Sequence, residues 1–365
     1  MEIERAKTLA LMQTRELSEA RIRNSEANRA QALAGDIICD SLPRRIVFEL
    51  TSACNLSCVT CGRNAANFKA TYFNPDWLSF FESSVDRIEE VTLMGWGEPT
   101  VHPEFVNFLD FARSNGLRKY FCTNGMRLKN LHGDIFKHEV DIIAVSLDGP
   151  DQDSNSRIRR GSDFTRITES IKEIVKTRGQ RGLQYPYINF VFTAMRSNIR
   201  KLPSMVTLAA QLGIEEVKCV FFTAFTEKLK KESLFSSQNL VRETFEQTAE
   251  LAERYGIILK LPHLPGEDPA GEQAHKTCYT AWRDVFIGSD GYFRPCMSTA
   301  QKLFSIDRYP SLEESWNGPE YQAFRATVNT AAMNSSCLHC YHSSFANWNK
   351  EDSFMQTGNV FAPTW

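Results

Sequence analysis

The sequence has no long hydrophobic run and no excess of charge of either sign. Its 365 residues carry 42 Lys and Arg against 44 Asp and Glu, a formal charge of −2. The sequence also lacks a local basic patch, which binding to nucleic acid would need. No apolar run approaches the roughly 20 residues of a membrane-spanning helix. The N-terminus also lacks the apolar core of a secretory signal. We therefore expect a cytoplasmic protein with neither a nucleic-acid nor a membrane partner.

Internal repeats and low-complexity tracts are also missing. With 42% hydrophobic residues, the length suffices for one large core plus a smaller attached domain. Residues 1–43 are rich in Glu, Arg and Ala, with scattered apolar positions such as Ile22 and Leu33. This pattern predicts a helical extension that ends near Gly35 and serves in packing or oligomerisation.

Six β-rich runs alternate with amphipathic helices over residues 44–262. The predicted strands are Arg45–Leu50, Glu90–Met94, Lys119–Thr123, Asp141–Ser146, Tyr187–Met195 and Glu216–Phe222. Repeated strand–helix units imply a parallel sheet with right-handed crossovers. Six units fall short of a closed eight-fold barrel. We therefore predict an α/β fold, a partial (β/α)6 TIM-like barrel whose functional residues lie at the carboxyl ends of its strands.

A Pro- and Gly-rich loop beginning at His263 predicts a domain boundary, so residues 263–365 form a separate C-terminal domain. Within it, Trp282–Ile287 and Tyr292–Cys296 flank the turn sequence Ser289-Asp290-Gly291. Two short strands around such a turn predict a β-hairpin.

Ten cysteines are present, and seven of them fall into two spaced groups. The first group is Cys54, Cys58 and Cys61, directly after the first predicted strand. Thiolates are the usual ligands of iron–sulfur clusters. Three on one loop can hold three corners of a four-iron cluster and leave the fourth iron open. Structural zinc, the alternative, would want four ligands in paired spacing. We expect Cys39 and Cys219 to be packing residues.

The C-x3-C-x2-C spacing after strand one resembles that of the radical S-adenosylmethionine (SAM) superfamily, and the resemblance extends over about residues 44–225. It implies that Cys54, Cys58 and Cys61 bind a [4Fe–4S] cluster whose open iron chelates SAM. An electron from a donor such as flavodoxin or ferredoxin would cleave SAM to methionine and a 5′-deoxyadenosyl radical. That radical would abstract a hydrogen atom from the substrate.

The resemblance also implies which residues contact SAM. The turn after strand two resembles the family's glycine–glutamate motif, and strands three and four end on polar residues as in the family. Of the three arginines at 157, 159 and 160, Arg160 precedes a glycine as the family's carboxylate-binding arginine does. Asn198 resembles a further recurrent position. The implied SAM-binding residues are Gly95, Gly97, Glu98, Asn124, Ser146, Asp148 and Arg160.

The second group is Cys278, Cys296, Cys337 and Cys340. This pattern resembles the twitch domain, a β-hairpin plus helix that is the short relative of the SPASM domain. It implies an auxiliary [4Fe–4S] cluster ligated by all four thiolates, with tetrahedral zinc as the alternative. No cysteine follows Cys340, so a second auxiliary cluster would lack ligands.

Domain order and cysteine spacing most resemble twitch-type enzymes that act on carbohydrates or aminocyclitols in antibiotic pathways. We therefore expect a small polar substrate whose secondary alcohol is oxidised to a ketone, with electron return through the auxiliary cluster. One alternative is an epimerase in which Cys122, at the end of strand three, returns a hydrogen atom. The other alternative is modification of a ribosomal peptide.

Overall fold

Parallel strands alternate with helices along most of the chain, as the sequence predicts. The computed structural model describes residues 16–65, 69–262, 278–297, 299, 301–335, 337 and 354–357. The chain divides into two units. Unit 1 comprises Met1–Ala53, Lys69–Tyr120 and Ala270–Glu351, and unit 2 comprises Cys54–Phe68, Phe121–Pro269 and Asp352–Trp365. The division falls within β3 (Arg118–Thr123).

Unit 1 is built around a short sheet in the order β10-β9-β8-β1-β2. Its strands are β1 (Arg45–Phe48), β2 (Glu90–Leu93), β8 (Asp284–Ile287), β9 (Tyr292–Arg294) and β10 (Phe304–Ser305). β1 pairs in parallel with both β2 and β8, whereas β8, β9 and β10 are antiparallel. The predicted hairpin therefore exists, and its first strand extends the parallel sheet beside β1. Its predicted start is two residues too early, because Trp282 lies in the helical turn α10 (Thr280–Arg283).

The helices of unit 1 are short apart from α2 (Glu19–Ala34) and α3 (Phe105–Ser114). Among the described residues, the others are α10, α11 (Leu312–Trp316), α12 (Pro319–Thr327), and the 3-10 helices η2 (Pro75–Phe81), η3 (Pro99–Val101) and η6 (Ile306–Arg308). Aromatic side chains fill the core, with Phe48 in edge contact with Phe73 and Phe81. Cys39 is also buried, which confirms it as a packing residue.

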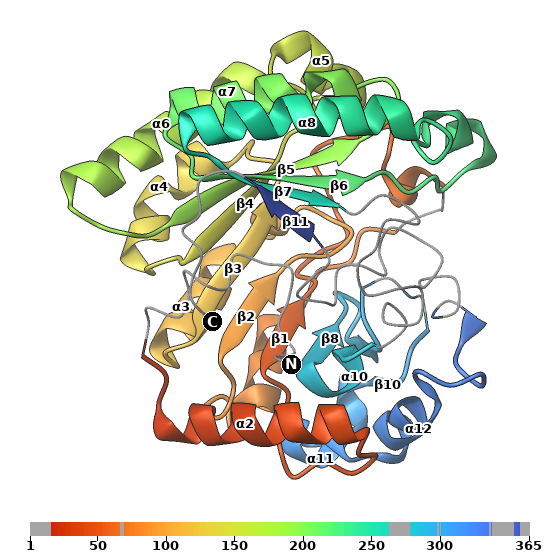
Figure 1. The fold of residues 1–365 in the computed structure, drawn as a ribbon. Helices are drawn as coiled ribbons and strands as arrows, with labels where there is room; N and C mark the ends of the chain where they lie inside the picture. The colour runs from red at the N-terminus through yellow and green to blue at the C-terminus, as the bar shows by residue number, and fades with distance from the viewer. Residues whose placement is uncertain are drawn as a thin grey trace. The chain divides into compact units, whose positions relative to one another are not determined.

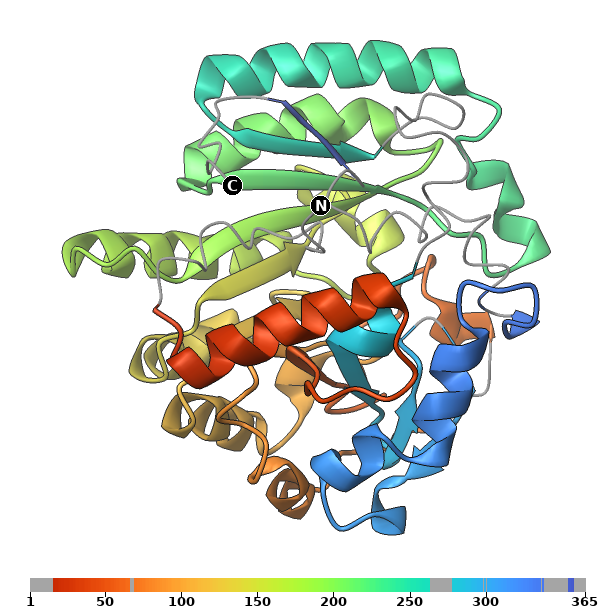
Figure 2. The same ribbon diagram turned by 60° about the horizontal axis from the view of Figure 1, so that its bottom comes forward.

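Unit 2 contains a sheet in the order β4-β5-β6-β7-β11. The parallel strands are β4 (Ile142–Ser146), β5 (Tyr187–Ala194), β6 (Glu216–Phe221) and β7 (Ile258–Pro262), and β11 (Phe354–Thr357) runs antiparallel to β7. The helices are α4 (Leu128–Lys137), α5 (Gln152–Ile158), α6 (Phe164–Gln180), α7 (Leu202–Leu212) and α8 (Gln238–Tyr255), with η1 (Gly62–Ala65), η4 (Ile199–Lys201) and η5 (Glu227–Glu232). Figures 1 and 2 show α6, α7 and α8 along one face of this sheet.

The sequence signals for helix ends hold in unit 2. Gly213 follows α7 with φ 70°, a left-handed conformation that its position after the last apolar turn predicts. The helix-facing side of the sheet is apolar, and Cys219 is fully buried there, which confirms its packing role. In the described parts of the chain, no helix has the length and apolar character to cross a membrane.

Helix α2 in unit 1 is held by polar rather than apolar contacts. Its scattered apolar residues Ile22 and Leu33 are 43% and 55% exposed. The buried positions are Asn24, Ser25 and Asn28, together with one alanine. The buried asparagines face main-chain carbonyl groups beneath the helix.

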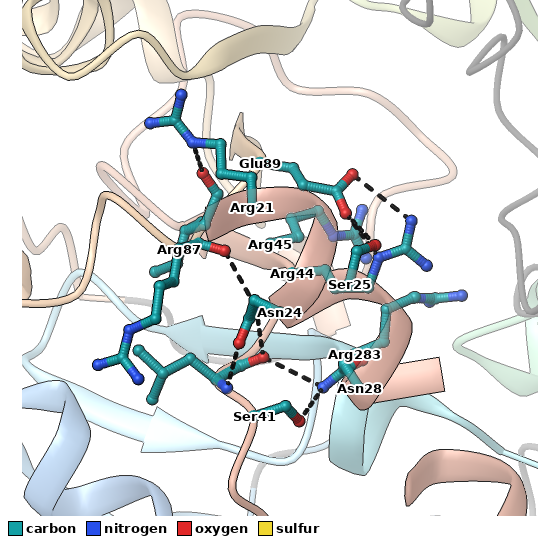
Figure 3. A network of polar contacts seen from close by, with 12 residues as sticks. Arg21, Asn24, Ser25, Asn28, Ser41, Arg44, Arg45, Arg87, Glu89 and Arg283 are labelled. Atoms are coloured by element: carbon teal, nitrogen blue, oxygen red, sulfur yellow. Dashed lines mark hydrogen bonds and ion pairs between the residues drawn. The ribbon is translucent and has the colours of Figure 1, made fainter. Parts of the chain in front are cut away.

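Those carbonyl groups belong to residues that precede β1, β2 and β8. Asn24 donates to the carbonyl oxygens of Leu42 and Arg87 at 3.1 and 3.0 Å. Figure 3 shows Asn24 and Asn28 side by side on α2 with their amides directed at these groups. Asn28 donates to the Leu42 oxygen at 3.1 Å and, outside that view, to the Trp282 oxygen at 2.8 Å. Buried carbonyl groups need such partners. The helix therefore ties together the starts of three strands.

Replacing Asn28 with Ala tests this role. The variant removes the Asn28 donor from the buried Trp282 carbonyl group and one of the two side-chain donors from that of Leu42. We therefore expect a loss of about 2–3 kcal/mol in the free energy of unfolding. Denaturant titration of the reconstituted protein measures it. Arg23→Ala is the control, because its ion pair with Glu19 joins side chains that are 70% and 88% exposed. It should cost less than about 0.5 kcal/mol. Equal losses in the two variants would contradict the role of Asn28.

Candidate functional site

The first cysteine group lies on a loop of unit 2 that pairs with the segment after α5. The Ser57 N–H donates to the Arg160 carbonyl oxygen at 3.0 Å, and the Val59 N–H donates to that of Ile158 at 2.8 Å. Within the loop, the Leu56 N–H points to Cys54 Sγ at 3.4 Å. The three cysteine thiols, half-buried and free of disulfides, are therefore carried on a loop of defined conformation. We call residues 54–61 the cluster loop.

Asn124, predicted from the end of β3, lies against the cluster loop. Its side-chain amide donates to Asn55 Oδ1 at 2.8 Å and lies 3.9 Å from Cys54 Sγ. Its own oxygen accepts the Met126 N–H at 3.0 Å. This arrangement orients the loop. Asn55 has the same positioning role and escapes sequence reasoning, because an asparagine between two cysteines carries no distinctive signal.

Asp148 is the most heavily bonded residue near the cluster loop. Its carboxylate accepts the Thr193 N–H at 2.8 Å and forms an ion pair with Arg159 at 2.8 Å. Its main-chain N–H donates to Asn155, and its carbonyl oxygen accepts from Asn198. The Asp148 side chain is fully buried. In this structure Asp148 and Asn198 thus join the ends of β4 and β5, and the SAM contact predicted for Asp148 stays a prediction.

The structure distinguishes the three arginines that follow β4. The side chain of Arg159 is only 14% exposed. It lies close enough to Cys58 to lower the pKa of that thiol, against the effect of burial. Arg157 and Arg160 are exposed, and Arg160 reaches the cluster loop through its carbonyl oxygen. The sequence alone could not separate them, because the inward-facing residue is set by where α5 ends.

Burial dominates the electrostatics of the cluster loop. It raises the pKa of the Cys58 thiol to about 11, and the Arg159 guanidinium acts in the opposite direction. Burial alone would lower the pKa of Arg159, but the negative charge of Asp148 raises it above its ordinary value. Arg159 is therefore a permanent cation that offsets the buried Asp148 carboxylate and favours ionisation of the nearby Cys58 thiol.

The turn after β2 in unit 1 packs against the segment that follows β1. A Cβ at Gly97 would overlap the carbonyl oxygens of Thr51 and Ala53, and one at Gly95 would overlap the side chain of Glu49. Only glycine fits these positions. Burial raises the pKa of Glu49, and its carboxylate accepts the Trp96 N–H at 2.8 Å. The turn is thus held between the main chain at Thr51 and Ala53 and the side chain of Glu49.

Glu98 caps the short helix η3 in the same turn. Its carboxylate accepts from the Thr100 hydroxyl at 2.6 Å and from the Thr100 N–H at 3.3 Å. Its N–H donates to the Ala53 carbonyl oxygen at 2.9 Å, and the residue is buried. Capping accounts for part of the hydrogen-bonding capacity of this carboxylate. The SAM contact expected of Glu98 remains a prediction.

Ser146 and Cys122 lie at strand ends in unit 2. Ser146 closes β4 and Cys122 is the penultimate residue of β3, and both are partly exposed. The Cys122 thiol lies near enough to Lys218 on β6 to influence the charge of that lysine.

Two cysteines of the second group, Cys278 and Cys337, lie near one another in unit 1, and Asn329 holds the first of them. This residue has φ 65°, and its side chain clamps both the N–H and the carbonyl of Cys278 at 2.6 and 3.1 Å. Burial raises the pKa of Cys337, and the neighbouring Cys278 raises it further. Cys296 follows β9 and is partly exposed. Cys340 lies outside the described residues.

A cavity of about 410 Å³ borders Cys337 in unit 1. Helix α12 supplies one wall, and residues 301–303 before β10 supply another. Among the described residues, no group of three His, Cys, Asp or Glu side chains converges on a single metal ion.

Comparison with known proteins identifies both cysteine regions. The model of the radical SAM superfamily matches residues 48–186, and that of SPASM, an iron–sulfur cluster-binding domain, matches residues 278–341. The chain combines a radical SAM domain with a SPASM domain. The resemblance to the radical SAM superfamily and to the SPASM group is thereby confirmed, whereas the shorter twitch form is a finer assignment that these matches do not make.

Relatives of this radical SAM protein act on different substrates. AdoMet-dependent heme synthase of Methanosarcina barkeri is 27% identical over 88% of this chain and 95% of its own length. PqqA peptide cyclase of Gluconobacter oxydans is 25% identical over 79% of this chain and 80% of its own. The structure of Streptococcus suis SuiB bound to S-adenosylmethionine shares the fold, with a TM-score of 0.63 at 17% identity over 84% of this chain and 72% of SuiB.

The cofactors follow from both domains: SAM and two [4Fe–4S] clusters. The chain's own residues fit these groups. The cluster loop presents Cys54, Cys58 and Cys61 on a backbone held by main-chain hydrogen bonds. In unit 1, Cys278 lies close enough to Cys337 to raise the pKa of the Cys337 thiol.

Iron content tests the ligand assignment. Anaerobically reconstituted protein should hold about eight iron atoms per chain, from two four-iron clusters. Replacing Cys54, Cys58 and Cys61 together with Ala should leave about four and abolish deoxyadenosine formation. Iron analysis and chromatography measure the two quantities. Unchanged iron in the triple variant would disprove the assignment of these cysteines.

A matched pair of arginine variants tests the burial argument. Arg159→Met leaves the buried Asp148 carboxylate without its cation, which should cost about 3–5 kcal/mol of unfolding free energy. Arg160→Met removes an exposed side chain and should cost less than about 0.5 kcal/mol. Denaturant titration compares them, and calorimetry with SAM follows binding. If only Arg160→Met weakened SAM binding, by about tenfold or more, the sequence prediction of Arg160 as the carboxylate ligand would hold.

Proposed function

We propose that this radical SAM enzyme modifies a peptide. The observation that carries the proposal is the similarity to PqqA peptide cyclase, which spans about four-fifths of both chains. SuiB supports it through the shared fold, since SuiB has also been solved bound to the precursor peptide SuiA, with a TM-score of 0.60. Peptide modification is therefore favoured over a small polar substrate.

In this proposal the chain's residues hold and shield the reacting groups. When bound, the reduced cluster and SAM supply a radical that abstracts hydrogen from unactivated carbon. Cys54, Cys58 and Cys61 hold that cluster, and Asn124 and Arg159 keep the loop in position. Direct contacts with SAM are assigned to Gly95, Gly97, Glu98, Ser146, Asp148 and Arg160 as proposals. A flavodoxin or ferredoxin is the proposed electron donor.

A second function, modification of a tetrapyrrole or other cofactor, is favoured by one observation. The heme synthase is similar over 95% of its own length, a larger share than the peptide cyclase. Oxidation of a sugar or aminocyclitol, which the sequence resemblance favoured, gains no support from these relatives, whose names specify a peptide and a haem.

Deuterium transfer distinguishes the substrates. A uniformly deuterated peptide encoded beside the gene should give deuterated 5′-deoxyadenosine, because the abstracted atom comes from the substrate. The peptide product should be two hydrogens lighter, with one deoxyadenosine formed per product. Mass spectrometry of both products measures this. A scrambled peptide of the same composition is the control and should yield no label.

Two results would contradict the peptide proposal. If deuterium appeared in 5′-deoxyadenosine only with a deuterated porphyrin, the enzyme would modify a tetrapyrrole cofactor instead. Epimerisation would instead be indicated by a product whose mass is unchanged in light water and that gains one deuterium when the reaction runs in heavy water. In that case Cys122→Ala should retain SAM cleavage but stop turnover after a single event.

A further inference from the structure

Two of the glutamates that unit 1 buries lie at opposite ends of its parallel strands. Glu89 immediately precedes β2 and is 6% exposed, whereas Glu49 immediately follows β1 and is 7% exposed. The Glu89 carboxylate pairs with Arg44 at 2.8 Å and accepts the Ser25 hydroxyl (Figure 3). Burial alone would raise the pKa of Glu89, but these partners hold it below its ordinary value. Charge balance therefore explains the burial of Glu89.

Glu49 has no comparable cation. Among the residues that the structure describes, no lysine or arginine forms an ion pair with its carboxylate. Burial chiefly raises the pKa of Glu49, and the N–H groups of Trp96 and Ser289 act in the opposite direction. Arg294 and Asp290 are the charged groups that act on it, and they are paired with each other at 2.8 Å. Charge balance thus gives no reason for an acid at this position.

The two oxygens of the Glu49 carboxylate contact two different turns. Oε1 accepts the Trp96 N–H at 2.8 Å in the turn after β2. Oε2 accepts the N–H and the hydroxyl of Ser289, both at 3.4 Å, in the turn between β8 and β9. The Glu49 N–H also donates to the Ile287 carbonyl oxygen at 3.0 Å. Glu49 therefore bridges the turns that follow the two strands paired with β1.

This bridge needs an acceptor at both ends of the side-chain group. A carboxylate accepts at both oxygens, whereas a glutamine of the same shape accepts at one and would direct its NH2 group at an N–H donor. Ser289 is held in place by the Thr71 hydroxyl, whose oxygen lies 2.7 Å from its own. On the other side, Gly95 packs so closely on the Glu49 side chain that a Cβ would overlap it. The position that it imposes on the turn at residues 95–97 explains the acid.

We propose that Glu49 is a positioning residue for SAM binding. It holds the turn at residues 95–97 against the turn at Ser289, and so keeps Gly95 and Gly97 where they contact SAM. The inference rests on the SAM contacts proposed for these glycines and adds the residue that positions them. Ser289 belongs to the region matched by the SPASM model. This region therefore supports the SAM-binding turn through Glu49.

Calorimetry of SAM with the anaerobically reconstituted enzyme tests the proposal. Glu49→Gln should bind SAM about tenfold more weakly or worse, because one of the two turns loses its acceptor. The KM for SAM should rise by the same factor. The kcat for deoxyadenosine formation at saturating SAM should stay within about threefold, since Glu49 stabilises the bound state as a whole and touches no reacting group.

Glu89→Gln is the matched control, because it changes a buried glutamate of the same unit in the same way. It weakens the ion pair with Arg44 and should lower the free energy of unfolding, yet it should bind SAM within about twofold of the wild type. A purely structural role for Glu49 would make the two variants behave alike.

Glu49→Asp separates reach from charge. It keeps both acceptor oxygens and the charge but is one methylene shorter, so it cannot span the two turns and should lose as much affinity as Glu49→Gln. It also replaces Glu49→Gln if iron analysis shows that this variant fails to load its clusters. SAM affinity within about twofold of the wild type in either folded Glu49 variant, or an equal loss in Glu89→Gln, overturns the inference.

Glu98→Gln distinguishes failure of this inference from failure of the proposed SAM contacts. If Glu98→Gln weakens SAM binding and the Glu49 variants do not, the positioning role alone is wrong. If none of these variants weakens it, the SAM contacts proposed for this turn are wrong as well. Peptide modification is decided separately by the deuterium experiment.

Discussion

The ion pair between Asp148 and Arg159 is the contact on which the cluster loop of unit 2 depends. A carboxylate with no exposed surface is stable there because the Arg159 guanidinium balances its charge and the Thr193 N–H donates to it. The same aspartate joins the ends of β4 and β5, and the segment carrying Arg159 forms the hydrogen bonds that shape the loop. The buried pair Asp148–Arg159 therefore connects the strand ends to the loop that carries the three thiols.

Much of the fold could be predicted from the sequence because local signals were strong. The six strand patterns, the glycine after α7 and the turn at Ser289–Gly291 were each decided by residues within a few positions. The pairing of β8 with β1 joins residues more than 200 positions apart. A four-residue strand carries no information about so distant a neighbour, so this part of the sheet could not be predicted.

The features of the candidate site also differ in how far the local sequence determines them. Cysteine spacing identified the cluster loop, since spacing is itself the chemical requirement. Spacing could not show which of the neighbouring arginines is buried, because the burial of Arg159 is decided by where α5 ends and by Asp148. Asn198 likewise resembles a recurrent family position, yet its amide is occupied by the carbonyl groups of Asp148 and Thr193.

Helix α2 and the sheet of unit 2 show opposite uses of buried polarity. Under α2, asparagines meet main-chain carbonyl groups, so these buried amides gain neutral partners and no charge is taken out of water with them. On β6 and β7, whole charges are buried, and each costs far more than a neutral amide. Neutral polar burial therefore joins strands at little electrostatic cost. The buried Glu216 carboxylate of β6, by contrast, depends on the Lys260 ammonium and on the Tyr187 and Asn189 donors to offset its desolvation.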